Sequence, residues 1–493
     1  MTIHHHPSYD LHGRAHRAML DQGFEPDIPA AAIRQVEGLE EERRTLTLEE
    51  GVRDLRSLLW SSIDNRESRD LDQIEVAETL PNGHIRVLVG IADVDALVPL
   101  GSPIDAHADH NKTSVYTGVS TFPMLPDALS ADLTSLIQGV DREVVVIALE
   151  VDVQGQVAAS DIFRALTHNF AKLAYEEVGA WLEDAGPIPP GVAAVPGMDA
   201  QIRLQSEAAH RLLGQRQRQG ALDFETVEAQ PVMEDGRVVD LQVPHKNRAR
   251  SLIENLMISA NMAMATYLET RGVPAIQRIV RSPERWSRIV DLAARMGEHL
   301  PPEPDSLALS AFLARRKAAD PTHFPDLSLS VVKLLGPGEY VVVRSSGEQA
   351  GHFGLAVHSY THSTAPNRRF ADLVIQRLIK AVLANTTAPY TPQILETIAA
   401  GCTEREDASR KVERLMRKVV AAVLMADRVG DQFEAIVTGA SPKGTYVRLT
   451  NPPVEGRVVR GERGLDVGDR ARVRLLAADP DRGFIDFECL YEE

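Results

Sequence analysis

HFGLAVHSYTHSTAPNRRFADLVIQRLIKA, residues 352–381, is the most informative stretch of the chain. Its second half has the apolar spacing of a helix, and Pro366 predicts that this helix begins near Asn367. Arg368 and Arg369 then fall in the first turn, where the helix dipole disfavours cations. Two surface charges are the simpler interpretation. An arginine pair beside free backbone N–H groups, however, suits a bound phosphate.

A second stretch, IDNRESRDLDQ at residues 63–73, places Asp64, Asp70 and Asp72 directly after an apolar segment. Carboxylates this close raise one another's pKa unless a cation lies between them. The cluster is therefore a candidate site for a hard cation such as Mg²⁺, with a solvated acidic loop as the simpler interpretation. Asp70 and Asp72 would face the same side of an extended strand, and Asp64 would arrive from the preceding strand end or turn. Together with the arginine pair, the cluster indicates phosphoryl transfer.

The overall composition is that of an ordinary globular protein of several domains. The 493 residues carry 53 Lys and Arg against 70 Asp and Glu, a formal net charge of −17. This balance argues against a protein that coats nucleic acid, although screening over about 10 Å allows a local basic channel. No apolar run approaches the ~20 residues of a membrane span, and the N-terminus lacks a secretory pattern. The two cysteines match no zinc spacing. We expect a cytoplasmic protein with no membrane partner.

Periodicity divides the chain into three parts. Residues 1–50 are predicted to form a short helical region, a candidate helix-turn-helix. Residues 51–430 begin with strands rich in Val and Ile and continue with long helices, which predicts an α+β domain. Residues 431–493 return to short strands and glycine turns, which predicts a small all-β domain of five strands. A hairpin is expected to turn at Asp235-Gly236. Helices are expected at about 171–186, 199–220, 248–272, 283–298, 305–317, 367–384 and 391–428.

Four motifs, in their order along the chain, resemble the catalytic domain of the ribonuclease II and ribonuclease R family, the RNB exoribonucleases. They are the acid cluster, SVYTGVSTFPMLPDALSADLTSLIQGVDR (114–142), RSLIENLMISAN (250–261) and YTHSTAPNRRFADLVIQR (360–377). The resemblance covers roughly residues 50–430 and implies a mixed sheet surrounded by helices. It also implies a Mg²⁺-dependent, processive exoribonuclease that hydrolyses single-stranded RNA from the 3′ end to nucleoside 5′-monophosphates. We expect single-stranded RNA as the partner and a monomer as the assembly.

The C-terminal part resembles an OB-fold RNA-binding domain of the ribosomal protein S-one type, through VTGASPKGTYVRL and EGRV. Residues 434–476 carry eight Lys or Arg against five Asp or Glu, so this part is locally basic. OB folds bind single strands through a positive groove and stacking aromatics. Candidates for stacking are Phe433, Tyr446 and Phe484. For each the alternative is a core position, which we favour for Phe484.

The resemblance implies a role for each residue of the two motifs. Asp64, Asp70 and Asp72 match the family's catalytic acids and are the expected metal ligands. Asp70 and Asp72 are also expected to be catalytic, and Asp72 is expected to orient the attacking water. Arg368 matches the arginine that contacts the scissile phosphate, and Arg369 is the second choice for that role.

Two further residues match family positions at the RNA 3′ end. Tyr116 matches an aromatic that stacks on the terminal base, although a core position is open for it. Glu254 matches a glutamate near the terminal sugar, and an acid on a largely apolar helix face is unusual unless it is paired. A contact with the 2′-hydroxyl would let the site distinguish RNA from DNA. Phe224 is a candidate for a second stacking residue.

The chain departs from the family pattern in three places, and the first two, at Gln73 and Met416, favour a rival. Gln73 stands where the family has a further acid, and Glu75, on the same strand face, is a candidate to compensate. Met416-Arg417-Lys418 stands where the family usually has Glu-Arg-Asp. About 50 residues precede the acid cluster, too few for two cold-shock domains. The rival is a non-catalytic or weakly catalytic RNA-binding protein on a decayed nuclease domain. A phosphodiesterase of small nucleotides is a third alternative, but it would not need the C-terminal barrel.

Overall fold

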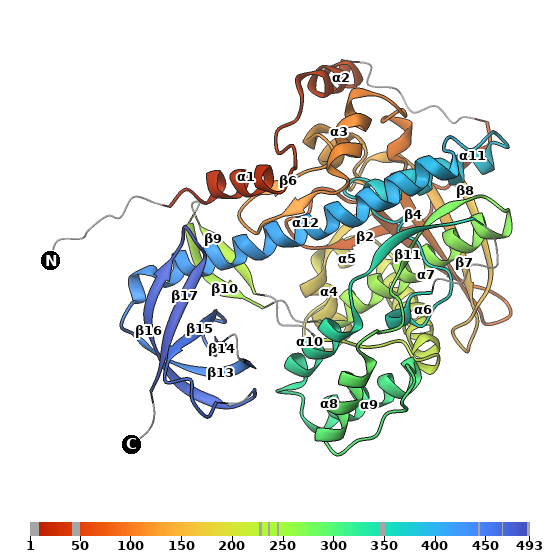
Figure 1. The fold of residues 1–493 in the computed structure, drawn as a ribbon. Helices are drawn as coiled ribbons and strands as arrows, with labels where there is room; N and C mark the ends of the chain where they lie inside the picture. The colour runs from red at the N-terminus through yellow and green to blue at the C-terminus, as the bar shows by residue number, and fades with distance from the viewer. Residues whose placement is uncertain are drawn as a thin grey trace.

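The computed structural model describes residues 9–41, 50–225, 229–234, 237–243, 246–344, 351–441, 444–465 and 467–490. In these ranges the chain folds as a mixed sheet with helices packed around it, followed by a closed barrel (Figure 1). The α+β class and the C-terminal all-β domain are therefore confirmed. No helix in the described ranges has the length and apolarity needed to cross a membrane.

The large domain is organised around a six-stranded sheet with the order β1-β8-β2-β3-β4-β7. Its strands form because apolar residues alternate along them: Ile85, Val87, Val89 and Ile91 of β4 are all buried. β8 pairs with β7 in antiparallel fashion over its first part and with β2 in parallel fashion near its end, so the sheet curls round. The strands are β1 (Arg53–Asp54), β2 (Trp60–Asp64), β3 (Gln73–Thr79), β4 (Ile85–Ala92), β7 (Asp141–Val151) and β8 (Val157–Ala174).

The acid cluster lies at one end of this sheet, in the connection between β2 and β3. β2 ends at Asp64, as expected, and β3 begins only at Gln73. Asp70 and Asp72 therefore belong to the loop before β3, so the prediction that they lie on a strand is wrong. On a strand, side chains two residues apart point to the same face of the sheet. Because Asp70 and Asp72 lie in a loop, this rule does not set their directions.

Helices cover the sheet and extend beyond it. α6 ends two residues before Gly220, whose φ of +96° is left-handed, as its predicted helix stop requires. The helix predicted from residue 171 starts only at Tyr175, because the preceding residues continue β8 beside β2. The helices are α3 (Pro103–Asn111), α4 (Tyr175–Leu182), α5 (Pro190–Ala193), α6 (Met198–Arg218), α7 (Arg248–Thr270), α8 (Trp286–Arg295), α9 (Ser306–Ala319), α10 (Phe324–Leu335) and α11 (Phe370–Leu383).

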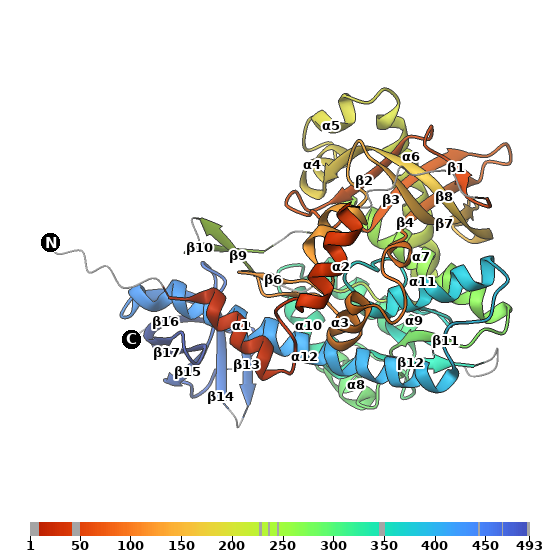
Figure 2. The same ribbon diagram turned by 90° about the horizontal axis from the view of Figure 1, so that it is seen from above.

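One long helix, α12 (Pro392–Met425), runs from the large domain to the barrel (Figures 1 and 2). It begins where the Thr391 side chain accepts a hydrogen bond from the Ile394 N–H, with a proline in the first turn. The N-terminal region is helical, as predicted. Its helix α1 (Leu11–Asp21) lies along α12, whereas α2 (Ala30–Glu41) packs against α3. Each N-terminal helix thus has its own neighbour, which does not favour a compact helix-turn-helix.

Three two-stranded sheets complete the large domain. The predicted hairpin is present as an antiparallel pair of strands, and its expected turn at 235–236 lies outside the described residues. The pairs are β5 (Val115–Tyr116) with β6 (Thr121–Phe122), β9 (Gln230–Glu234) with β10 (Arg237–Gln242), and β11 (Ala275–Ile279) with β12 (Glu339–Val343).

The C-terminal domain is a closed five-stranded barrel, as predicted, with the order β13-β14-β15-β17-β16. Phe433 is buried in it, whereas Tyr446 and Phe484 are exposed. The preferred core position for Phe484 is therefore wrong. Phe487, three residues later, fills the core instead. The strands are β13 (Gln432–Ser441), β14 (Gly444–Leu449), β15 (Glu455–Arg460), β16 (Arg470–Asp479) and β17 (Phe484–Leu490).

Candidate active site

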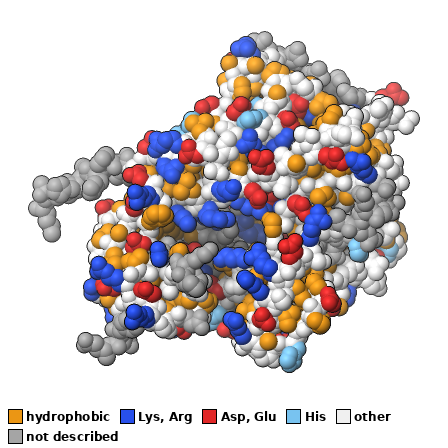
Figure 3. All heavy atoms as spheres, viewed as in Figure 1, with side chains coloured by type: hydrophobic (Ala, Val, Ile, Leu, Met, Phe, Trp, Pro, Cys, Tyr) orange, Lys and Arg blue, Asp and Glu red, His pale blue; other side chains and the backbone are white. Residues whose placement is uncertain are grey.

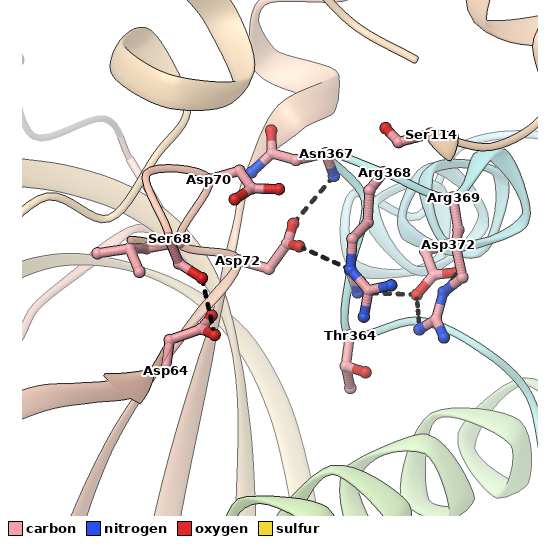
Figure 4. Close-up of polar contacts among 12 residues, drawn as sticks. Asp64, Ser68, Asp70, Asp72, Ser114, Thr364, Asn367, Arg368, Arg369 and Asp372 are labelled. Atoms are coloured by element: carbon pink, nitrogen blue, oxygen red, sulfur yellow. Dashed lines mark hydrogen bonds and ion pairs between the residues drawn. The ribbon is translucent and has the colours of Figure 1, made fainter. Parts of the chain in front are cut away.

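Asp72 is the point at which the two sequence motifs meet. Its side chain is buried, and its Oδ1 accepts a hydrogen bond of 3.0 Å from the backbone N–H of Asn367. Its Oδ2 lies 3.7 Å from Nε of Arg368 (Figure 4). Burial raises the pKa of Asp72 to about 7, although the charge of Arg368 acts in the opposite direction.

Arg368 and Arg369 are adjacent but have different surroundings. Arg369 donates from Nε and Nη2 to the two carboxylate oxygens of Asp372, at 2.9 and 2.7 Å, and Asp372 is fully buried. The Arg368 side chain is 43% exposed and keeps its guanidinium beside Asp72. Helix α11 begins at Phe370, three residues later than predicted, so both arginines precede it. Each arginine thus has a carboxylate partner, Asp72 for Arg368 and Asp372 for Arg369. Of the two, Arg368 is the one whose guanidinium a ligand can reach.

Asp64 and Asp70 lie in the same part of the structure as Asp72, at the connection between β2 and β3 (Figure 4). Asp64 Oδ1 accepts hydrogen bonds from the Asn65 N–H at 2.6 Å and the Ser68 hydroxyl at 3.0 Å. Burial raises the pKa of Asp64, and the nearby charge of Asp70 adds to this effect. Asp70 Oδ2 accepts a hydrogen bond of 3.0 Å from the Tyr116 hydroxyl. The loop thus directs three carboxylates toward one region while each is held by a different partner.

Hydrogen bonds join the β5–β6 hairpin, which carries Tyr116 (the Tyr116 hairpin), to the loop that carries Arg368 and Arg369 (the arginine loop). The Ser114 N–H donates to the Arg368 carbonyl at 2.9 Å, and the Thr113 hydroxyl donates to the same oxygen at 3.2 Å. Tyr116 follows two residues later and is exposed, so the alternative of a core position is not realised. Its ring is available for stacking, while its hydroxyl contacts the acid cluster.

A divalent cation fits this donor set by its chemistry. The three side chains offer only carboxylate oxygens, and two of them have raised pKa values, which a cation would relieve. Within the described ranges, however, no three His, Cys, Asp or Glu side chains come close enough to hold a metal ion. The ligand set predicted from sequence therefore lies in one region of the structure, but its carboxylates are not drawn together as a closed metal site.

A fourth acid near the cluster is Glu75, which the sequence suggested as compensation for Gln73. It is fully buried on β3, and neither of its carboxylate oxygens has a hydrogen-bond partner. Burial raises its pKa well above the ordinary value, and the charge of Asp64 adds to the shift. Gln73 is only half-buried.

Glu254 lines a cavity of about 720 Å³ between α6 and α7. Its side chain is half exposed, with Oε2 lying 3.7 Å from Nζ of Lys246. Arg216 lines the same cavity and donates to the side chain of the buried Asn255. Phe224, the candidate second stacking residue, is half-buried and packs against the apolar cluster of α8, α9 and α10.

The position of Met416 is structural. Met416 is fully buried in the apolar cluster that α12 shares with the barrel, so its side chain has no place at the acid cluster. One acid of α12 that does contact the large domain is Glu406, whose Oε1 accepts from Nη2 of Arg278 at 2.7 Å. Sequence reasoning overlooked Glu406, although it lies on the same predicted helix. It also overlooked Asn367, because a backbone N–H donor leaves no side-chain signal.

Lys and Arg side chains gather along α12 and around the hollow of the face below it (Figure 3). This gathering occurs in a chain whose formal net charge is −17. The positive charge is therefore local, as a channel for an anionic polymer requires.

Comparison with known proteins gives matches along the whole chain. Residues 52–385 match the model of the RNB domain, and residues 431–490 match that of the RNase II-type exonuclease C-terminal S1 domain. Ribonuclease R 1 of Lactococcus lactis is 30% identical over 95% of this chain, and the chain spans 60% of that relative's length.

Solved structures show the same fold. Mycoplasma genitalium RNase R in complex with ribose methylated single-stranded RNA matches 98% of this chain and 78% of its own, with a TM-score of 0.86 at 22% identity. Yeast Ssd1, described as a pseudonuclease, matches 94% of this chain and 57% of its own, with a TM-score of 0.69 at 17% identity. Because this fold also occurs in a pseudonuclease, the side chains of the site must carry the functional argument.

Proposed function

The chain belongs to the RNB family, and from this premise we propose that it is a processive 3′-to-5′ exoribonuclease. In this proposal it hydrolyses single-stranded RNA to nucleoside 5′-monophosphates and depends on Mg²⁺. The observation that carries the proposal is the approach of Asp72 and Arg368, which brings a proton acceptor and a phosphate ligand to one point.

Asp72 is suited to accept the proton of an attacking water. Burial brings its pKa to about 7 in the metal-free protein, and a bound cation would keep the carboxylate ionised and able to orient the water and accept its proton. Arg368 is suited to hold the scissile phosphate, because its guanidinium is accessible and lies beside Asp72. Its fixed charge would stabilise the phosphate oxygens as the bond to the leaving 3′ oxygen breaks.

Asp64, Asp70 and Asp72 are the residues that would hold Mg²⁺, which when bound would offset the negative charge that develops on the phosphate. The donor chemistry of this set supports the assignment. The hydrogen bonds from Ser68, Tyr116 and the backbone of Asn367 orient the three carboxylates.

The 3′-terminal nucleotide is assigned to the region where Tyr116 and Arg368 lie beside the acid cluster. Tyr116 offers an exposed ring for its base, and base–aromatic stacking is worth about 1–3 kcal/mol. Glu254 is assigned to the terminal sugar, where its carboxylate would accept a hydrogen bond from the 2′-hydroxyl. Arg369 is a structural residue in this proposal, because both of its hydrogen bonds go to Asp372.

The barrel is assigned to the incoming RNA strand. It has an OB-like closed form, and Tyr446 and Phe484 are exposed on it. Together with the Lys and Arg side chains along α12, it would guide a single strand toward the acid cluster (Figure 3). A cytoplasmic monomer stays a prediction.

The rival is an RNA-binding protein that has lost catalysis, and Gln73 is the observation that favours it. Met416 also favours it, because a buried apolar side chain stands where the family usually has an acid. The two functions are separated by incubating uniformly labelled single-stranded RNA with the protein and either Mg²⁺ or EDTA. Mononucleotide release that requires Mg²⁺ supports the exoribonuclease. Intact RNA with retained binding supports the rival.

A further inference from the structure

Glu75 is a buried charge that the proposed chemistry leaves unexplained. It is fully buried in the middle of the sheet, and both of its carboxylate oxygens lack a hydrogen-bond donor. Among the residues that the structure describes, no Lys, Arg or His forms an ion pair with it. An ionised carboxylate without a partner costs several kcal/mol in such a place, so an acid here requires a compensating charge or the loss of its own.

The groups around Glu75 are oxygen atoms that also lack partners. Ser61 stands directly opposite Glu75 across the β2–β3 pair, and its buried hydroxyl has no hydrogen bond. Gln205 of α6 donates from Nε2 to the Glu75 carbonyl oxygen at 3.2 Å, while its Oε1 is buried and unpaired. Directly opposite residues have Cβ atoms about 4.5–5.5 Å apart. Four unpaired oxygens from three neighbouring residues thus occupy one buried region.

This region adjoins the acid cluster. β2 carries Ser61 and ends at Asp64, and β3, its antiparallel neighbour, carries Glu75 and begins just after Asp72. Burial is the main cause that raises the pKa of Tyr175, the first residue of α4 beside the end of β2, and the charges of Asp64 and Glu75 both add to it. The oxygen region and the Asp64 carboxylate are therefore close enough to interact electrostatically.

We propose that Glu75 supplies the carboxylate that Gln73 lacks, and that it binds a divalent cation together with Asp64, assisted by the Ser61 hydroxyl and the Gln205 amide oxygen. Carboxylate, hydroxyl and amide oxygens are all ligands that suit hard divalent cations. Compared with the family pattern, this chain carries the acid two residues later on β3, at Glu75 instead of position 73, and on the same face of the strand. The inference deepens the proposed function, because it rests on a metal ion at the acid cluster.

The test measures ion binding without RNA, so that it does not depend on activity. Mn²⁺, which takes the same oxygen ligands, is titrated into wild-type protein and Glu75→Gln and followed by electron paramagnetic resonance. Glutamine has the shape of a neutral glutamic acid. We expect Glu75→Gln to weaken Mn²⁺ binding at least about 10-fold. Restoring an acid at the family position, in Gln73→Asp combined with Glu75→Gln, should recover affinity.

The matched control is Glu78→Gln, because Glu78 lies on the same strand but is exposed and paired with Arg86 at 2.7 Å. It should leave Mn²⁺ binding unchanged. Ser61→Ala, a smaller change that removes one of the unpaired oxygens, tests the same site if Glu75→Gln fails to fold, and it should also weaken binding. Wild-type affinity in Glu75→Gln, or in Ser61→Ala if that variant is needed, would show that Glu75 is an uncharged acid and overturn the inference. Wild-type protein that binds Mn²⁺ but releases no mononucleotides would instead refute the proposed function alone.

Discussion

Oδ2 of Asp72 lies 3.7 Å from Nε of Arg368, although the two residues belong to motifs near opposite ends of the large domain. Asp72 is buried and Arg368 is partly exposed, so the carboxylate of the pair is enclosed by protein while the guanidinium is accessible to a ligand. An accessible guanidinium beside a buried carboxylate is the arrangement that the proposed phosphate site requires.

The two adjacent arginines should respond differently to substitution. Arg368→Gln should lower kcat/KM by about 10²–10³-fold, because it removes a charge that faces the phosphate, and should leave the free energy of unfolding nearly unchanged. Arg369→Gln should destabilise the protein by about 3–5 kcal/mol, because it leaves Asp372 buried without its partner. Urea unfolding and rate measurements on both variants check this. Equal loss of stability in the two variants would contradict the assignment.

Metal affinity should depend on pH. In the metal-free protein Asp72 has a pKa of about 7, so below that pH it is protonated and must lose a proton before it can bind a cation. Mg²⁺ affinity should therefore fall as the pH is lowered from about 8 to about 6, by up to about tenfold per unit for each displaced proton. Calorimetric titration at several pH values measures this. In Asp72→Asn the contribution of Asp72 should be missing, and a flat profile in wild-type protein would contradict the prediction.

Tyr116 should determine how tightly the last nucleotides of the RNA are bound. Tyr116→Ala removes the exposed ring and should weaken binding of a short RNA by about 1–3 kcal/mol, with a longer limit product. Tyr116→Phe keeps the ring and loses only the hydrogen bond to Asp70, so its limit product should match that of the wild type. Gel analysis of the final products compares the two. An unchanged product length in Tyr116→Ala would exclude the stacking role.

The barrel aromatics should separate into binding and core residues. Tyr446→Ala and Phe484→Ala should each weaken the binding of a long single-stranded RNA by about 1–3 kcal/mol and leave the stability unchanged, because both side chains are exposed. Phe433→Ala should destabilise the barrel by about 3–5 kcal/mol, since that ring is buried. Filter binding and thermal unfolding measure the two effects. Full RNA affinity in the double variant of Tyr446 and Phe484 would assign the strand to another surface.

Much of the fold was predictable because its signals are local. Alternating Val and Ile predict the strands of the sheet, and Gly220 marks the end of α6 through its left-handed backbone. α10 was missed, since Pro325 in its first turn makes the segment look like a loop. Phe484 and Phe487 were hard to tell apart, because which ring enters the barrel depends on register.

The site was predictable as a set of residues but not as an arrangement. The sequence identified the three aspartates and Arg368, whereas their separate partners depend on tertiary contacts. The different surroundings of Arg368 and Arg369 follow from the burial of Asp372, which only packing decides. The isolation of Glu75 is equally a property of its neighbours in space, since a lone acid in a strand carries no sign of whether it has a partner.

The most direct test of the central claim is a comparison of wild-type protein and Asp72→Asn on single-stranded RNA, with hydrolysis and binding measured on the same preparations. Asparagine keeps an oxygen that can accept the Asn367 N–H but cannot take a proton from water. We expect the release of nucleoside 5′-monophosphates to fall by at least about 10²–10⁴-fold, while RNA binding stays largely intact. Mononucleotide release at the wild-type rate in Asp72→Asn would show that the chemistry takes place elsewhere.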